Sequence, residues 1–394
     1  MSRSTTALAM IAAAETIVWA ALFYFFPIML LRWEADLGWD RGDVALAFTL
    51  ALAVSALASP LFGRLIDLGL SRFTLPATAA VGGLALIFLA SVQSQTVFYA
   101  TWAIIGFCCA GCLYEPCFAF LTRVKGENAR GAITMVTLVA GFASSISYPV
   151  ADALAGAYGW RFAATVFAAA VLLIAVPLFT VSAHILQKDA IPQTVAPAQD
   201  HAAATAARRT LTFWLLATAF PLLAITHGMA ISHIIPLMGD KGATHAQAVL
   251  AASLIGPMQV VGRIVMMTAG RRLSGADITL ISFGGIALSM LIMLSAQSGD
   301  WRIFGFVTLL GACYGVQSIT KPLVTADLLG LAGFGAISGA LALPYIAAVA
   351  AAPFAAVLFW RWGGYDLMLV AGAVFTTAAV PCLWLARRSA LRRA

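Results

Sequence analysis

Apolar runs close to the length of a bilayer crossing recur along the whole chain. A helix needs about 20 residues to cross the hydrocarbon core of a membrane. Runs of that length fill most of the 394 residues, and short polar intervals separate them. Only 10% of the residues are charged, against roughly 25% in an average soluble domain. Because a soluble fold could not bury so much apolar surface, the sequence predicts an all-α membrane protein.

The runs predict twelve transmembrane helices in two sets of six. The first set comprises 5–31, 43–62, 74–94, 96–122, 131–157 and 161–183. The second comprises 210–238, 246–268, 277–296, 302–327, 335–359 and 365–385. The longest polar interval lies between the sets and contains Pro192 and Pro197, as a linker should. We therefore expect an N-terminal six-helix bundle, a cytoplasmic linker and a C-terminal six-helix bundle, over 1–183, 184–209 and 210–394.

Basic residues indicate how the spans are oriented, because cytoplasmic loops carry an excess of Lys and Arg. With both termini in the cytoplasm, that excess falls in the inner loops and the tail, at Arg64, Arg72, Arg123, Lys125, Arg130, Lys188, Arg208, Arg209, Arg271, Arg272, Arg387, Arg388, Arg392 and Arg393. The net charge of +7 is thus an orientation signal rather than a nucleic-acid patch. We expect a multi-pass protein of the cytoplasmic (inner) membrane that contacts the lipid bilayer and binds no nucleic acid.

Tryptophans predict the outer boundary of the membrane. An indole at the interface can bury its ring and keep its N–H hydrated. The predicted outer ends of the spans hold Trp33, Trp39, Trp160, Trp301, Trp360 and Trp362. This belt predicts the same topology as the basic residues.

The two halves also resemble each other in sequence. Phe26-Pro27 matches Ile235-Pro236, Gly63-Arg64 matches Gly270-Arg271, and Glu115-Pro116 matches Lys321-Pro322. The offsets are 209, 207 and 206 residues. Three ordered matches at a nearly constant shift indicate an internal repeat of six spans.

The loop after the second span reads Gly63-Arg64-Leu65-Ile66-Asp67-Leu68-Gly69-Leu70-Ser71-Arg72. It resembles the GxLxDxxGRR signature of the major facilitator superfamily, although Gly69 comes one residue early and the basic pair is reduced to Arg72. The resemblance implies two pseudo-symmetric six-helix bundles that work by alternating access. It also implies a gating role for this loop when the protein opens outward. The alternative is a merely solvated loop with cytoplasmic charges.

Within that superfamily the chain looks nearest to the monocarboxylate and oxalate:formate transporters. The resemblance lies in Phe26-Pro27, Leu37-Gly38-Trp39, Gly159-Trp160-Arg161 and Arg263. It implies that Arg263 binds a substrate carboxylate. The chain departs from the pattern at Gln259, where an acid is common, and at Ile28, where a lysine is common. The patterns that drug antiporters usually carry in the fourth and fifth spans are missing here. Efflux of amphipathic compounds therefore ranks second, as the alternative function.

Ionisable side chains within spans are costly and are functional candidates by default. The chain places six there, namely Glu15, Glu115, His227, His233, Arg263 and Lys321. The family resemblance implies that spans one, four, seven and ten line a central cavity, and five of the six residues lie on those spans. Glu15 or Glu115 is expected to carry a coupling proton, since a carboxyl that loses its hydration can exchange protons near neutral pH. One of the two histidines is the alternative carrier, because an imidazole titrates near neutral pH. Glu115 and Lys321 could instead form a structural ion pair at a gate.

Helical spacing adds polar and aromatic neighbours to these charges. Gln259 precedes Arg263 by four residues and Gln317 precedes Lys321 by four, so each pair shares a helix face. We expect substrate contacts from Arg263, Lys321, Gln259, Gln317, Tyr314, His227, His233, Trp19, Tyr24 and Tyr114. Apolar rings beside a few fixed charges suit a small-molecule site.

Other chemistries have little support in the sequence. All six cysteines lie in apolar runs, where they read as helix-packing residues rather than disulfide or metal ligands. His227 and His233 are six residues apart and point to different helix faces, which argues against a shared metal. We expect no metal, cofactor, ATP site or enzymatic activity, and a monomer that uses H⁺ as its coupling ion. A membrane receptor or scaffold is a third possibility, but the chain carries no long soluble appendage.

Overall fold

Helices make up nearly all of the part of the chain that the computed structural model describes. That part comprises residues 3–126, 129–188, 205–269, 272–297, 300–330 and 334–391, apart from the side chains of residues 67, 130, 269, 335 and 336. Within it, eleven helical segments are long and apolar enough to cross a membrane. The last, Ile337–Leu391, contains non-helical Gly363 and Gly364 and joins two helices across a kink. The predicted all-α membrane fold with twelve spans is therefore confirmed.

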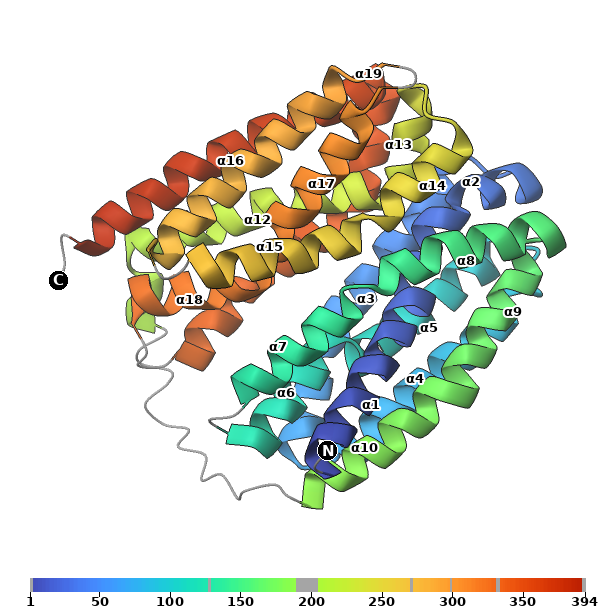
Figure 1. Cartoon of the computed structure of the whole chain (residues 1–394), viewed down its shortest axis with the longest axis horizontal. Helices are drawn as coiled ribbons and strands as arrows, with labels where there is room; N and C mark the ends of the chain where they lie inside the picture. Colours follow the sequence, from blue (N-terminus) through green and yellow to red (C-terminus); the bar gives the residue numbers. More distant parts are fainter. Residues whose placement is uncertain are drawn as a thin grey trace. The chain divides into compact units, whose positions relative to one another are not determined.

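The chain divides into two compact units, Met1–Gln193 and Thr194–Ala394. The predicted linker 184–209 crosses that division, and its residues 189–204 lie outside the described part. The helices of the first unit are α1 (Arg3–Val18), η1 (Trp19–Tyr24), α2 (Phe25–Leu37), α3 (Arg41–Asp67), α4 (Ser71–Leu89), α5 (Gln95–Cys112), α6 (Tyr114–Lys125), α7 (Ala129–Ala140), α8 (Ala143–Tyr158), α9 (Trp160–Ala170), η3 (Val171–Ala175) and α10 (Val176–Lys188). In this unit α4 packs along α9 and α10, and α10 packs along α1 (Figure 1).

The second unit has the same kind of long antiparallel helices. They are α12 (Leu211–Ser232), α13 (Ile234–Asp240), α14 (His245–Ser253), α15 (Ile255–Ala269), α16 (Gly275–Leu294), α17 (Arg302–Gly315), α18 (Gln317–Leu329) and α19 (Phe334–Leu391). The long α19 packs against α12 and α16, while α15 and α16 pack on α17 (Figure 1).

Several spans are interrupted just before a proline. Leu113 separates α5 from α6, and Pro116 is the third residue of α6. Proline has no N–H to donate to the carbonyl four residues earlier, so the helix cannot run through regularly. His233 separates α12 from α13 in the same way, three residues before Pro236. In the first span the π-helical segment η1 ends shortly before Pro27.

Glycines allow two helix pairs to touch backbone to backbone. A Cβ on Gly106 would lie 2.0 Å from the carbonyl oxygen of Ala51, which brings α5 against α3. A Cβ on Gly262 would lie 2.0 Å from the carbonyl oxygen of Ala312, which brings α15 against α17. Membrane helices pack through such small residues because lipid offers no hydrophobic drive for their association.

Charged pairs gather where neighbouring helices end. In the first unit Asp36 accepts from the indole of Trp160 at 2.8 Å and from Arg161 at 2.7 Å, which joins the ends of α2 and α9. In the second unit Lys241 pairs with Asp366, and Arg387 pairs with Asp277 at 2.5 Å. Such contacts fix the order of helix ends within each unit.

The predicted tryptophan belt is wrong for one of its members. Trp33 is fully buried, and its indole nitrogen has no hydrogen-bond partner among the described residues. Its ring packs edge-on against Phe26 and Trp102, with centroids 5.1 and 5.7 Å away. The large apolar area of an indole outweighs the unmade hydrogen bond when rings surround it. Trp301 and Trp362 are 73% and 72% exposed, as expected of interface residues.

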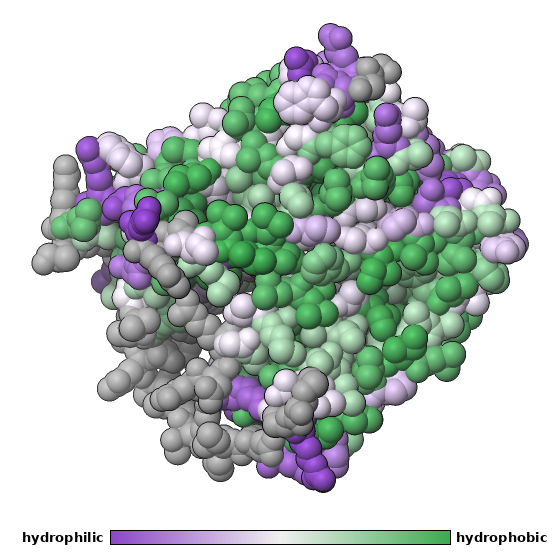
Figure 2. Space-filling model, in the orientation of Figure 1, coloured by the Kyte–Doolittle hydropathy of each residue, from purple (hydrophilic) through white to green (hydrophobic). Residues whose placement is uncertain are grey.

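The surface carries large apolar side chains that a water-soluble protein would bury. Leu57, Leu173 and Trp214 are 83%, 75% and 61% exposed. Figure 2 shows hydrophobic residues over much of the displayed face, with hydrophilic residues gathered toward its margins. A broad apolar surface with polar margins suits a protein surrounded by lipid.

Candidate functional site

Glu15 lies in the interior of the first unit, near the end of α1. Its side chain is fully buried. Neither carboxyl oxygen has a hydrogen-bond partner in the part of the chain that the structure describes. Cys117 of α6 and Trp19 of η1 are polar neighbours of this carboxyl. An ionised carboxylate at this place would lack the partners that a buried charge needs.

Aromatic rings adjoin this carboxyl in the first unit. The ring of Trp19 lies 4.6 Å from that of Tyr114 and 6.1 Å from that of Tyr24, measured between centroids. Tyr24 in turn meets Tyr148 edge-on at 5.8 Å. Trp19 and Tyr24 are the first and last residues of the π-helical turn η1, and such turns are frequent at functional sites. The three predicted aromatic residues of this unit therefore form one group (Figure 1 locates α1 and α6).

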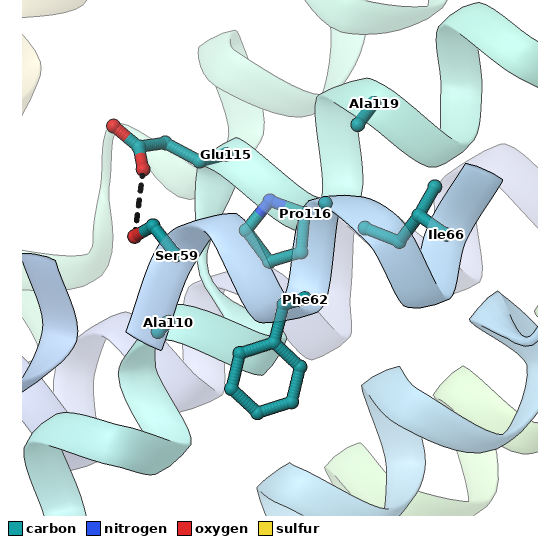
Figure 3. Close-up of a pocket in the computed structure, with 8 residues that line it drawn as sticks. Ser59, Phe62, Ile66, Ala110, Glu115, Pro116 and Ala119 are labelled. Atoms are coloured by element: carbon teal, nitrogen blue, oxygen red, sulfur yellow. Dashed lines mark hydrogen bonds between the residues drawn. The ribbon is translucent and has the colours of Figure 1, made fainter. Parts of the chain in front are cut away.

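Glu115 occupies a different environment from Glu15. It is exposed, and it accepts a long hydrogen bond of 3.4 Å from the hydroxyl of Ser59 on α3. The two side chains border a cavity of about 80 Å³ whose walls include Phe62, Pro116 and Ile66 (Figure 3). The acidic residue predicted for the fourth span thus faces a small cavity between α3 and α6.

In the second unit four side chains form what we term the tyrosine cluster: His227, Tyr314, Tyr345 and Lys321. The imidazole of His227 lies flat on the ring of Tyr314, with centroids 3.3 Å apart and an angle of 2° between the planes. The Tyr314 hydroxyl is 3.1 Å from the Tyr345 hydroxyl. The ammonium of Lys321 stands 3.5 Å above the centre of the Tyr345 ring. The cluster brings together three predicted substrate residues and one residue that was not predicted.

Arg263 lies on α15 and contacts the break between α17 and α18. It is 4% exposed and donates from Nε to the carbonyl oxygen of Gly315 at 3.0 Å. The next freed carbonyl, that of Cys313, accepts from the hydroxyl of Ser282 at 2.5 Å. Gln317 donates to the same hydroxyl at 2.9 Å. These bonds supply donors for carbonyls that the helix break leaves without their regular partners.

Gln259 and His233 take no part in the hydrogen bonds described above for Arg263, Ser282 and Gln317. The backbone of Gln259 presses against Gly315, whose added Cβ would lie 2.4 Å from the Gln259 carbonyl oxygen. His233 is buried and its Nδ1 is 3.1 Å from the hydroxyl of Tyr365. The described contact of His233 is thus with Tyr365, which is not a member of the tyrosine cluster. Among the described residues no group of three His, Cys, Asp or Glu side chains could hold a metal ion.

The loop of the family signature is held within the first unit. Gly69 has φ of +80°, a conformation that favours glycine. Its carbonyl accepts from the side chain of Gln187 at 2.6 Å, and Arg123 donates to the carbonyl of Ile66 at 2.8 Å. Gly63, Arg64 and Arg72 belong to α3 and the start of α4, and the side chain of Asp67 lies outside the described part.

Sequence patterns did not predict Tyr345, Ser282, Ser59 or Tyr365. Each is a hydroxyl-bearing side chain whose partner lies on a different segment of the chain. Only the packing of one helix on another shows what these hydroxyls contact. The one available signal for Tyr345 is its position directly after Pro344, since prolines interrupt several spans of this chain near polar residues.

A helical membrane fold with ionisable side chains inside its spans is typical of a transporter. The sequence profile of the Major Facilitator Superfamily matches residues 8–330. The chain belongs to this superfamily of membrane transporters. None of the curated proteins compared with it by sequence gives a match.

Solved structures share the fold at low sequence identity. A bacterial homologue of the human lysosomal transporter Spinster, inward-facing and unoccupied, has a TM-score of 0.72 and 15% identity, covering 100% of this chain and 99% of its own. Tetrameric PepTSo2 has a TM-score of 0.67 and 12% identity, covering 99% and 97%. The E. coli fucose:proton symporter FucP has a TM-score of 0.66 and 14% identity, covering 98% and 99%. Identities this low support the fold and leave the substrate open.

Proposed function

We propose that the protein is a proton-coupled carrier that moves a small organic anion of the carboxylate type across the cytoplasmic membrane by alternating access. The observation that carries the proposal is the placement of two cations on either side of one helix break. Arg263 bonds the carbonyl of Gly315 just before the break, and Lys321 lies in the first turns of the helix that follows. Cations inside a membrane protein are costly and suit an anionic substrate.

The chemistry of the two cations supports a carboxylate in particular. A guanidinium presents a planar fork that matches a carboxylate with two parallel hydrogen bonds. Lys321 adds a compact charge beside the aromatic walls of the tyrosine cluster. The buried carboxyl of Glu15 is our candidate for the coupling proton, with Glu115 as the second candidate.

Proteoliposomes provide the direct test. We expect radiolabelled lactate, formate or oxalate to accumulate when the outside is made acidic, and unlabelled carboxylate inside to accelerate exchange. Arg263→Ala liposomes serve as the matched control. Full activity in that variant, or wild-type liposomes that ignore every carboxylate, would contradict the proposal.

Efflux of amphipathic compounds is the second candidate. It is favoured by the aromatic group of Trp19, Tyr24 and Tyr114 in the first unit, because ring faces bind varied apolar bodies. Ethidium export from the same proteoliposomes, insensitive to added carboxylates, is the outcome expected of this candidate. We further propose that both termini are cytoplasmic and that the carrier is a monomer, which cysteine labelling of the tails and mass photometry would check.

A further inference from the structure

The indole N–H of Trp19 is a buried hydrogen-bond donor without a partner among the described residues. The carboxyl of Glu15 is a fully buried acceptor in the same situation, at both of its oxygens. Buried polar groups in proteins are nearly always hydrogen-bonded, so each exception calls for an explanation. Here an unused donor and an unused acceptor lie about one helical turn apart in the first unit.

Helix geometry places the two groups on one face. Glu15 precedes Trp19 by four residues, and Val18 at the junction of α1 and η1 has φ of −69° and ψ of −36°, so the helix continues through it. Side chains four residues apart on a helix are neighbours. The thiol of Cys117 is the other polar neighbour of this carboxyl. A thiol is a weak donor, so the indole N–H is the stronger of the two.

Contacts that do not involve the carboxyl hold the indole in place. The ring centroid of Trp19 lies 4.6 Å from that of Tyr114 and 5.0 Å from that of Phe23. The π-helical turn is tied to α8, because the hydroxyl of Ser147 donates to the carbonyl oxygen of Ala20 at 2.7 Å. The N–H therefore stays beside the carboxyl whichever protonation state the carboxyl adopts.

Further ionisable side chains near Glu15 or on the elements packed against α1 are Cys112, Cys117, Tyr24, His184 and Lys188. The two thiols face Glu15 from α5 and α6. The histidine and the lysine are exposed on α10, and Tyr24 packs at the far end of η1 against Tyr148. On α7 the ionisable residue is Arg130, whose side chain lies outside the described part. Within the described part, stabilisation of a Glu15 carboxylate thus depends on hydrogen bonds from the indole and the thiols.

We propose that Trp19 is a positioning residue for proton release, whose indole N–H donates to the Glu15 carboxylate as the proton leaves. The carboxyl gives its proton to a hydrating water molecule, and the indole keeps its own. A hydrogen bond to an ionised carboxylate is stronger than one between neutral groups and favours the charged form. This inference rests on the proposed function and specifies how the proton site of that carrier works.

An isosteric substitution tests the donor without changing the ring. Benzothienylalanine replaces the indole N–H by sulfur and can be inserted at position 19 by stop-codon suppression. Infrared difference spectra of the protein in liposomes record the C=O band of protonated Glu15, identified by its absence in Glu15→Gln. In wild type this band should disappear as the pH rises. In Trp19→benzothienylalanine it should persist to a pH about one unit higher, which corresponds to roughly tenfold tighter proton binding. Trp19→Phe, which also lacks the N–H, should move the band in the same direction.

Trp102 provides a matched control. Its indole nitrogen is also buried without a partner among the described residues, but its ring packs on Phe26 and Phe98. Trp102→benzothienylalanine should leave the Glu15 band unchanged, and Cys117→Ala should move it less than the change at Trp19 does.

Two readouts from the same liposomes separate this inference from the proposed function. An unchanged band in both Trp19 variants, an equal shift in the Trp102 variant, or a wild-type Glu15 band that ignores pH would each overturn the inference. Lactate uptake driven by a pH gradient is measured independently of the band. Failure of wild-type liposomes to accumulate any carboxylate would overturn the proposed function, whatever the infrared spectra show.

Discussion

The guanidinium of Arg263 donates from Nε to the carbonyl oxygen of Gly315, 3.0 Å away, at the last residue of α17. The residue that the sequence singled out as a carboxylate ligand therefore also stabilises a helix end. The two roles are compatible, since a guanidinium has five N–H donors and the fork used for a carboxylate can involve the terminal nitrogens. Binding of an anion at Arg263 would in this way be linked to the geometry of the break.

Arg263→Ala should abolish carboxylate transport while the protein is still produced. The substitution removes the fork and one of two donors to the Gly315 carbonyl, which keeps the Ser318 hydroxyl at 3.2 Å, so we also expect a stability loss of about 0.5–1.5 kcal/mol. Arg263→Lys should recover part of the stability but little transport, because a point charge cannot replace a bidentate contact. Counterflow and thermal unfolding in detergent measure the two effects.

Arg302 provides a matched control for that experiment. It also donates to a carbonyl at a helix end, that of Ser295, at 2.7 Å. Arg302→Ala should lose a bond of the same type at an exposed position and retain transport. Equal damage to transport in both variants would mean that Arg263 acts only as a helix clamp.

Gly106→Ala should destabilise the first unit strongly. The added methyl group would lie 2.0 Å from the Ala51 carbonyl oxygen, so α3 and α5 would have to separate. Overpacking of this kind costs roughly 1–3 kcal/mol or more. Gly131→Ala is the control, because nothing lies within 4 Å of its added Cβ and alanine favours the helix. Yield and unfolding temperature should fall for Gly106→Ala and hold or rise for Gly131→Ala.

The sequence predicted the fold because its strongest signal is the one that a membrane enforces. Apolar length and charge placement determine which segments cross the bilayer, and the family profile and structure confirmed that prediction. The helix breaks at Leu113 and His233 could also have been predicted from the sequence, since both residues stand three positions before a proline. The burial of Trp33 could not be predicted, because an indole near a span end has the same local sequence whether rings or headgroups surround it.

Site geometry was harder to predict, because it depends on which helix packs against which. Helical spacing placed Gln317 with Lys321, yet Gln317 bonds Ser282 on a neighbouring helix and Lys321 bonds the ring of Tyr345. A shared helix face says nothing about the partner that faces it. The stacking of His227 on Tyr314 likewise joins residues 87 positions apart, a distance that no local pattern spans.

Asp67→Asn should slow turnover more than it weakens substrate binding. The residue ends α3 in the loop of the family signature, where Arg123 and Gln187 already hold neighbouring backbone carbonyls. We expect its carboxylate to stabilise one end state of the transport cycle, so its loss changes rates of interconversion rather than affinity. Asp240→Asn, at an exposed position, is the control. Weaker binding with unchanged turnover would show that the loop has no gating role.

Glu115→Gln and Lys321→Gln test whether these two residues form a structural pair. If they do, each single variant leaves an uncompensated charge and should damage folding or gating, and the double variant should recover part of the loss. The roles we propose, a substrate contact for Lys321 and a second candidate proton site at Glu115, require the two residues to act independently. On that proposal we expect additive effects in the double-mutant cycle, measured by yield and counterflow. Recovery in the double variant would instead assign the two residues to a gate.

Glu15→Gln should remove the dependence of transport on a pH gradient and retain exchange of substrate between the two sides. The Glu15 carboxyl is fully buried, and its oxygens have no hydrogen-bond partner among the described residues. Such surroundings favour the protonated, neutral form, and the carboxyl must be hydrated or paired before it releases its proton. Glutamine imitates the protonated form and cannot release a proton.

Glu115→Gln, at an exposed carboxylate bonded to Ser59, is the matched comparison and should keep pH-driven uptake. Counterflow and pH-driven uptake, measured side by side in proteoliposomes, distinguish the two carboxylates. Normal pH-driven uptake by Glu15→Gln would exclude it from coupling, and a loss confined to Glu115→Gln would assign the proton to the cavity between α3 and α6.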